Sequence, residues 1–75
     1  DLNKQNPDNV SVINQLAKLG MKTNQLDKAL ERLQRALSIE SENIMSNCLM
    51  ADLLMRRNES AAAEEYINKC KSLKE

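Results

Sequence analysis

The sequence predicts an all-α fold in which two antiparallel helical hairpins stack in an open array, and three observations support this. The 75 residues include one glycine and one proline, so few positions break a helix. Tyr66 is the single aromatic residue, and a core of Leu, Ile, Met, Val and Ala suits helix packing better than a sheet. Residues 10–41 also align without a gap with residues 44–75. A repeat of that length is typical of helical arrays.

Helices are expected at about residues 9–22, 25–39, 43–57 and 60–74. The first follows a turn at Asn6 and Pro7, and Asp8 or Asn9 can cap it. Its apolar residues recur at the spacing of one helical face. They are Ile13, Leu16, Ala17 and Gly20, with Leu19 and Met21 widening the face.

Polar breaks separate the later helices. Asn24 precedes the second helix and Asn58 the fourth, and asparagine tolerates the left-handed conformation that a tight turn requires. Asn43 can cap the third helix, whose apolar residues cover more than half of its circumference and predict contacts on two sides. Such short loops make successive helices antiparallel neighbours. The repeat favours an open stack, and a closed four-helix bundle with an accidental repeat is the alternative.

The repeated unit resembles the tetratricopeptide repeat, a 34-residue helical hairpin with the pattern W-x2-L-G-x2-Y, then A-x3-F, then A and P. In the first unit the matching residues are Ile13, Leu16, Ala17, Gly20, Ala29, Leu33 and Ala36. In the second they are Asn47, Met50, Ala51, Leu54, Ala63, Ile67 and Cys70. The departures are Ala17 and Ala51 for glycine, Gly20 and Leu54 for tyrosine, Ser41 for proline, and Asn47 for a large apolar residue. The resemblance implies an open right-handed solenoid.

One repeat segment is expected to span residues 1–75. Residues 1–9 form the end of a preceding repeat and a cap, residues 10–43 the first repeat and residues 44–75 the second. Pro7 lies where the family places the proline that closes a unit. The sequence begins at Asp1 without an initiator methionine, so we expect a piece of a longer protein.

Composition argues against several classes of function. Lys plus Arg and Asp plus Glu number 11 each, so the chain has no basic footprint for nucleic acid. No apolar run reaches the roughly 20 residues needed to cross a bilayer. No histidine or glycine-rich loop is present, so an enzyme and a cofactor are not expected. Glu64 and Glu65 are adjacent on a helix and read as a solvated face.

The two cysteines are too few for a disulfide framework and lie outside any Cys-x-x-Cys motif. We expect Cys70 to be a buried, unreactive thiol and Cys48 to be more exposed, both unpaired. Unpaired thiols incline the prediction towards the reducing cytoplasm, and the compartment is otherwise unassigned. Two separated cysteines do not supply a metal site.

The resemblance implies a protein-binding groove lined by the first helix of each hairpin. Its residues are Ser11, Asn14, Lys18, Met21 and Lys22 in the first unit, and Met45, Cys48, Asp52, Met55 and Arg56 in the second. Their common spacing lies on one helical face. Methionines offer adaptable apolar surface and the cations add charge, so we expect a partner segment with apolar anchors and acidic residues. Alternatively, the methionines pack inside the stack.

Some family members clamp the carboxylate of chaperone tails with a Lys at the fifth repeat position and an Asn at the ninth. Here these positions hold Asn14 and Lys18, then Cys48 and Asp52, so that specialisation is not expected.

The open end of the last hairpin is a second candidate surface. Tyr66, Ile67, Cys70 and Leu73 would lie there without a following repeat to cover them. We expect self-association into a homo-oligomer through this end, or dependence on neighbouring repeats. A further alternative is a structural spacer that only continues a longer solenoid.

Overall fold

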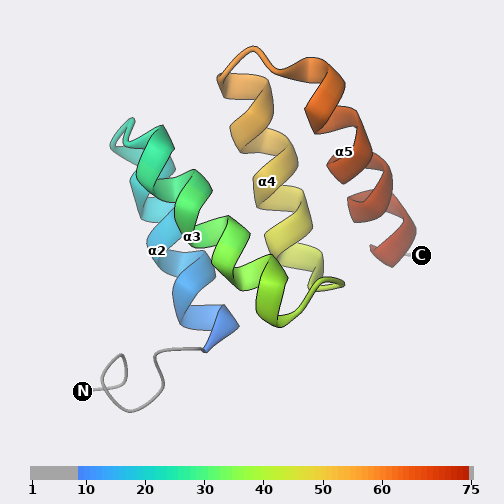
Figure 1. Ribbon diagram of the computed structural model, residues 1–75, viewed down its shortest axis with the longest axis horizontal. Helices are drawn as coiled ribbons and strands as arrows, with labels where there is room; N and C mark the ends of the chain where they lie inside the picture. The colour runs from blue at the N-terminus through green and yellow to red at the C-terminus, as the bar shows by residue number, and fades with distance from the viewer. Residues whose placement is uncertain (1–8, 75) are drawn as a thin grey trace.

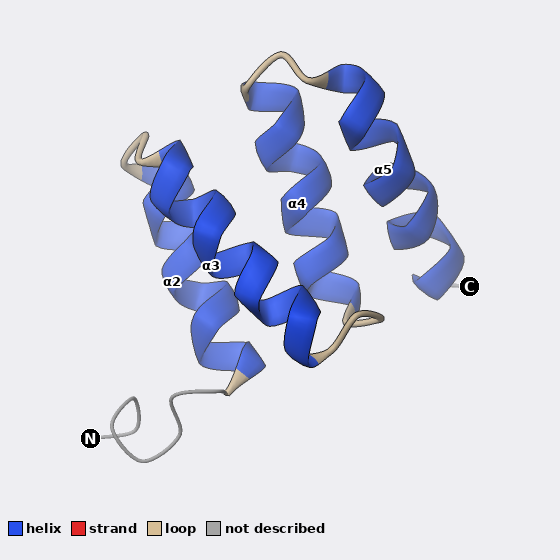
Figure 2. Cartoon of the chain, in the orientation of Figure 1, coloured by secondary structure: helices blue, strands red, loops and turns tan. Residues whose placement is uncertain are grey.

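Within the part of the chain that the structure describes, residues 9–74, the fold consists of four helices. They are α2 (Val10–Lys22), α3 (Leu26–Ile39), α4 (Ile44–Arg56) and α5 (Ser60–Lys74), joined by short loops (Figure 2). The computed structural model thus confirms the predicted all-α fold, and each helix begins and ends within one residue of the expected position. The preceding repeat predicted before residue 9 lies outside the described residues.

The helices form two hairpins that stack side by side. α2 packs against α3, α4 packs against α5, and α4 contacts both helices of the first hairpin. α2 and α5 lie at opposite ends of the molecule (Figure 1), and no packed interface joins them within residues 9–74. A closed bundle is therefore excluded, because closure would require α5 to pack against α2.

Both hairpins have the same turn between their two helices, and the two turns lie 34 residues apart in the sequence. Asn24 and Asn58 each have a φ of 63°. The backbone N–H of Gln25 donates to the carbonyl of Gly20 at 2.7 Å, and that of Glu59 to Leu54 at 2.8 Å. These bonds satisfy carbonyls at the end of α2 and α4 and reverse the chain, as in a Schellman motif. The predicted left-handed role of both asparagines is confirmed.

Asparagines also begin α2 and α4. The side chain of Asn9 accepts a hydrogen bond from the backbone N–H of Val12 at 3.1 Å, and that of Asn43 from Ser46 at 2.9 Å. Each bond satisfies an N–H that lacks a partner in the first helical turn. Asn9 and Asn43 are thus the caps that the sequence predicted.

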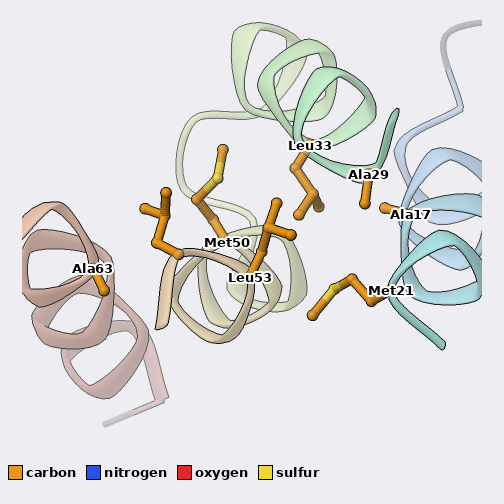
Figure 3. Packing of buried hydrophobic residues seen from close by; sticks show 8 residues of the cluster. Ala17, Met21, Ala29, Leu33, Met50, Leu53 and Ala63 are labelled. Atoms are coloured by element: carbon orange, nitrogen blue, oxygen red, sulfur yellow. The ribbon is translucent and has the colours of Figure 1, made fainter. Parts of the chain in front are cut away.

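The core lies along the joint between the two hairpins. Figure 3 shows Leu33 of α3 and Met21 of α2 facing the side of α4 that carries Leu53. Ala17 and Ala29, both fully buried, let α2 and α3 approach closely. At the same contact a Cβ on Gly20 would lie 3.4 Å from the Cβ of Ala29. Small residues therefore set the hairpin spacing, and larger apolar residues fill the joint.

The prediction of two unpaired cysteines was wrong. Cys48 in α4 and Cys70 in α5 form a disulfide, with their Cα atoms 5.0 Å apart. The two residues are 22 positions apart in sequence, but antiparallel packing brings the first half of α4 beside the last half of α5. The prediction of a reducing compartment was based on free thiols, so the disulfide removes its support.

Candidate functional site

The predicted groove residues lie on two adjacent helices, because α2 and α4 contact each other directly. We define the α2–α4 surface as the predicted groove residues with exposed side chains. They are Ser11, Lys18, Lys22, Met45, Asp52, Met55 and Arg56. Asn14, Met21 and Cys48 are the remaining predicted residues, and each has a different environment.

Asn14 is not available to a partner, because it is only 1% exposed. Its side-chain oxygen accepts a hydrogen bond from the Ser46 hydroxyl at 2.7 Å, and its amide donates to the side-chain oxygen of Asn43 at 3.2 Å. These bonds join α2 to the start of α4. Asn14 therefore fastens the two hairpins together, since a buried amide must satisfy its polar atoms internally.

A second asparagine is buried where the family pattern expects a large apolar residue. Asn47 is 1% exposed, and its amide donates to the backbone carbonyls of Ser41 at 3.2 Å and Asn43 at 2.8 Å. The Asn47 side chain therefore supplies hydrogen-bond donors to carbonyls of the loop that joins the two hairpins. Asparagine at position 47, in place of the family's large apolar residue, thus stabilises this loop through its two side-chain hydrogen bonds.

The methionines divide between core and surface. Met21 is 5% exposed and belongs to the core cluster, so the alternative that methionines pack inside the stack holds for this residue. Met45 and Met55 are 44% and 50% exposed. They lie near the two ends of α4, and just under three helical turns separate their Cα atoms. The accessible apolar anchors of the surface are therefore on α4.

The charges of the α2–α4 surface are predominantly positive. Lys18 and Lys22 on α2 have no carboxylate partner among residues 9–74. Arg56 pairs with Asp52 one turn earlier on α4, at 3.4 Å, and both side chains are about half exposed. An exposed pair of this kind is weak, so a stronger acidic partner can compete for Arg56.

Sequence reasoning did not identify Leu19 as a site residue. It assigned Leu19 to the apolar face of the first helix, but the side chain is 57% exposed. Leu19 lines an open hollow of about 260 Å³ together with Gln15, Lys18 and Lys22. No local signal distinguishes Leu19 from its buried repeat counterpart Leu53, because the difference depends on which hairpin has a neighbour.

The end of the last hairpin is partly covered. Tyr66 and Ile67 are half-buried against the core cluster, Leu73 is half-buried, and Cys70 is in the disulfide. Tyr66 also borders an open hollow of about 190 Å³ with Leu37, Asn47 and Lys69 among its lining residues. Self-association through this end stays a prediction.

Two classes of site have no described residues to support them. Within residues 9–74, no three His, Cys, Asp or Glu side chains group as metal ligands. No helix in that range is long and apolar enough to cross a membrane.

Two stacked helical hairpins with matching turns and caps define a helical-repeat module. Over residues 10–43 and again over residues 46–75, the sequence matches the family described as tetratricopeptide repeat. The chain belongs to the tetratricopeptide repeat family, as the resemblance predicted. A comparison with curated proteins gives no match. Repeats of this family generally mediate protein–protein interaction and form non-enzymatic scaffolds.

Proposed function

We propose that the chain is a protein-interaction module whose α2–α4 surface binds an extended or helical segment of a partner protein. The observation that carries the proposal is the exposure of Met45 and Met55 on a surface where Lys18 and Lys22 have no carboxylate partner among residues 9–74. Methionine side chains adapt to different apolar partners and recur at binding surfaces that accept varied segments.

The charge of the surface favours an acidic partner. Three cations, Lys18, Lys22 and Arg56, stand against one carboxylate, Asp52. Electrostatic attraction of this kind speeds association and selects the orientation of the partner more than it adds affinity. The partner segment is therefore expected to carry two apolar anchors for Met45 and Met55, with carboxylates on the side that faces α2.

The direct test is selection from a displayed library of random 15-residue peptides, using the disulfide-bonded chain as bait. Selected peptides are expected to be rich in Leu, Ile, Met or Phe and in Asp or Glu. Binding of a selected peptide is then measured by fluorescence anisotropy for Lys18→Glu/Lys22→Glu and for Met45→Ala/Met55→Ala. Each double variant should weaken binding by about tenfold or more, the size of a lost interfacial contact of 1.4 kcal/mol.

A matched control reverses two charges away from this surface. Lys69→Glu/Lys71→Glu on α5 changes the net charge by the same amount as Lys18→Glu/Lys22→Glu. It should leave peptide affinity within about twofold, because screened charges act locally. Equal weakening by both charge variants, or selected peptides without acidic and apolar bias, would contradict the proposal.

A spacer role is the second candidate, and the exposure of Leu19 favours it. Leu53, the repeat counterpart of Leu19, is fully buried against the first hairpin. A preceding hairpin placed on α2 as the first hairpin is placed on α4 would bury Leu19 in the same way. If peptide selection fails and a chain with an added preceding hairpin is more stable, the spacer role is supported instead.

A further inference from the structure

The last helix is the least securely packed of the described helices. α2, α3 and α4 each pack against at least two other helices, whereas α5 packs chiefly against α4 (Figure 1). Ala63 is the one fully buried residue of α5, whereas α3 has three such residues. The apolar residues Tyr66, Ile67 and Leu73 are half-buried. Packing alone therefore holds α5 more weakly than α3.

Polar contacts between side chains do not compensate for this weak packing. Among the side-chain hydrogen bonds and ion pairs within residues 9–74, none joins α4 to α5. Arg57, at the end of α4, instead pairs with Asp27 of α3 at 2.5 Å and with Glu59 in the adjoining turn at 2.6 Å. The first hairpin thus has an exposed ion pair with the second hairpin, whereas α5 has no side-chain ion pair or hydrogen bond to α4 among residues 9–74.

The disulfide supplies the missing tie. Cys48 lies in the first half of α4 and Cys70 in the last half of α5, so the bond closes the end of the hairpin opposite the turn at Asn58. With the turn alone, α5 can swing away from α4. With both the turn and the disulfide in place, α5 is held near both ends.

Comparison of the two repeats supports this role. The counterparts of Cys48 and Cys70 in the first hairpin are Asn14 and Ala36, both buried and without any covalent link. That hairpin has α4 packed against both of its helices. The covalent link is therefore found in the hairpin whose second helix has fewer neighbours.

We propose that the Cys48–Cys70 disulfide is a thiol–disulfide exchange site, and that its reduction releases α5 from α4. Both cysteines are partly exposed, so a small dithiol can reach them. One thiolate of the dithiol attacks a sulfur of the disulfide, and the other cysteine leaves as a thiolate and takes up a proton. The second thiol of the reductant then displaces the first cysteine. Two electrons pass to the protein, which holds two thiols, and the reductant becomes a cyclic disulfide.

Release of α5 would uncover apolar surface on α4. Met50 and Leu54 of α4 are 2% and 6% exposed and share the core cluster with Ala63 of α5. Ile67 packs against the same cluster. The reduced protein would therefore present a helix-binding apolar strip that the oxidised protein hides. This inference depends on the disulfide and the packing of α5, and it stands apart from the proposed function of the α2–α4 surface.

Hydrogen exchange read by mass spectrometry tests the proposal on the full chain, oxidised and then reduced with dithiothreitol. A gain of two hydrogens in mass confirms the reduction. Amides of α5 should then exchange at least roughly tenfold faster, because opening of a locally unstable helix is no longer restrained by a closed loop. Amides of α2 and α3 should change by less than about twofold, since their packing does not involve the disulfide.

Cys48→Ala/Cys70→Ala provides the permanently unlinked protein, with alanine as in Ala36 of the first repeat. It should show the fast α5 exchange of the reduced protein, bind a hydrophobic fluorescent dye more strongly than the oxidised protein, and not respond to dithiothreitol. Full α5 protection in either the reduced protein or this variant would overturn the proposal. Equal loss of protection from all helices would also overturn it, because the disulfide would then stabilise the whole fold without controlling α5.

Discussion

Asparagine residues have several distinct roles in this chain, each set by its position relative to a helix. Asn9 and Asn43 begin helices through side-chain hydrogen bonds to the backbone. Asn24 and Asn58 end helices in the left-handed conformation. Asn14 is buried and joins two helices. The short amide side chain allows all three roles, because it both donates and accepts and tolerates positive φ.

The left-handed asparagines lead to a prediction at the residue scale. Asn24→Ala and Asn58→Ala should each lower the free energy of unfolding by about 1 kcal/mol, because alanine keeps the Cβ that crowds the following carbonyl at positive φ but lacks the short polar side chain that lets asparagine tolerate this conformation. Asn24→Gly and Asn58→Gly are the matched controls and should stay within about 0.5 kcal/mol of the parent, since glycine adopts this conformation freely. Urea unfolding of the oxidised protein measures both. Equal costs for the alanine and glycine variants would show that the backbone conformation does not matter.

At the scale of elements, polar contacts at two places align the hairpins. Near the start of α4, Asn14 of α2 binds Ser46 and Asn43. Just beyond its other end, Arg57 binds Asp27 of α3. Hydrogen bonds to Glu59 first, and then to Asp27, raise the pKa of Arg57. Because the pKa is raised on folding, the charged Arg57 stabilises the fold fully at pH values below the pKa of the unfolded state. This stabilisation is lost only as the pH rises through the pKa of the folded state, so Arg57 stays charged at physiological pH.

The buried contact should matter more than the exposed one. Asn14→Ala should cost about 1–3 kcal/mol, because Ser46 then loses its buried acceptor in α2. In a double-mutant cycle with Ser46→Ala, the combined cost should fall below the sum of the single costs by about 0.5 kcal/mol or more. Arg57→Ala should change the unfolding midpoint little, because exposed pairs are screened by water. Strict additivity of Asn14→Ala and Ser46→Ala would rule out the proposed joint.

At the scale of the whole molecule, the ends of the stack break the symmetry of the repeat. Leu19 is 57% exposed and its counterpart Leu53 is fully buried. Met21 is 5% exposed and its counterpart Met55 is 50% exposed. In each pair the buried member lies at the joint between the hairpins. The joint accordingly buries one member of each pair and leaves the other at an uncovered face.

Identical substitutions at repeat-equivalent positions should therefore have unequal costs. Leu53→Ala should lower the free energy of unfolding by about 2–5 kcal/mol, as expected for a cavity in a packed core. Leu19→Ala should change it by less than about 0.5 kcal/mol, as is usual for an exposed site. Thermal and urea unfolding at several protein concentrations compare them. A large cost at Leu19 that grows with protein concentration would instead indicate that a second copy covers this face.

The sequence was sufficient for features that depend on neighbours along the chain. Helix positions, the caps at Asn9 and Asn43, and the turns at Asn24 and Asn58 all follow from local spacing and residue type. The gapless alignment of residues 10–41 with 44–75 added the hairpin stack and the family. The sequence predicted a groove that included Lys18, Lys22, Met45 and Met55, which are exposed, together with Asn14 and Met21, which are buried. Binding of a partner there stays a prediction.

Only the tertiary structure decided which residues far apart in the sequence contact each other. The disulfide of Cys48 and Cys70 depends on how α4 lies against α5. The burial of Asn14 depends on the approach of Ser46 across the joint. The exposure of Leu19 depends on the side of the stack that its hairpin occupies. Local patterns specify which face of a helix is apolar, but the neighbour that covers that face is set by packing of the assembled hairpins.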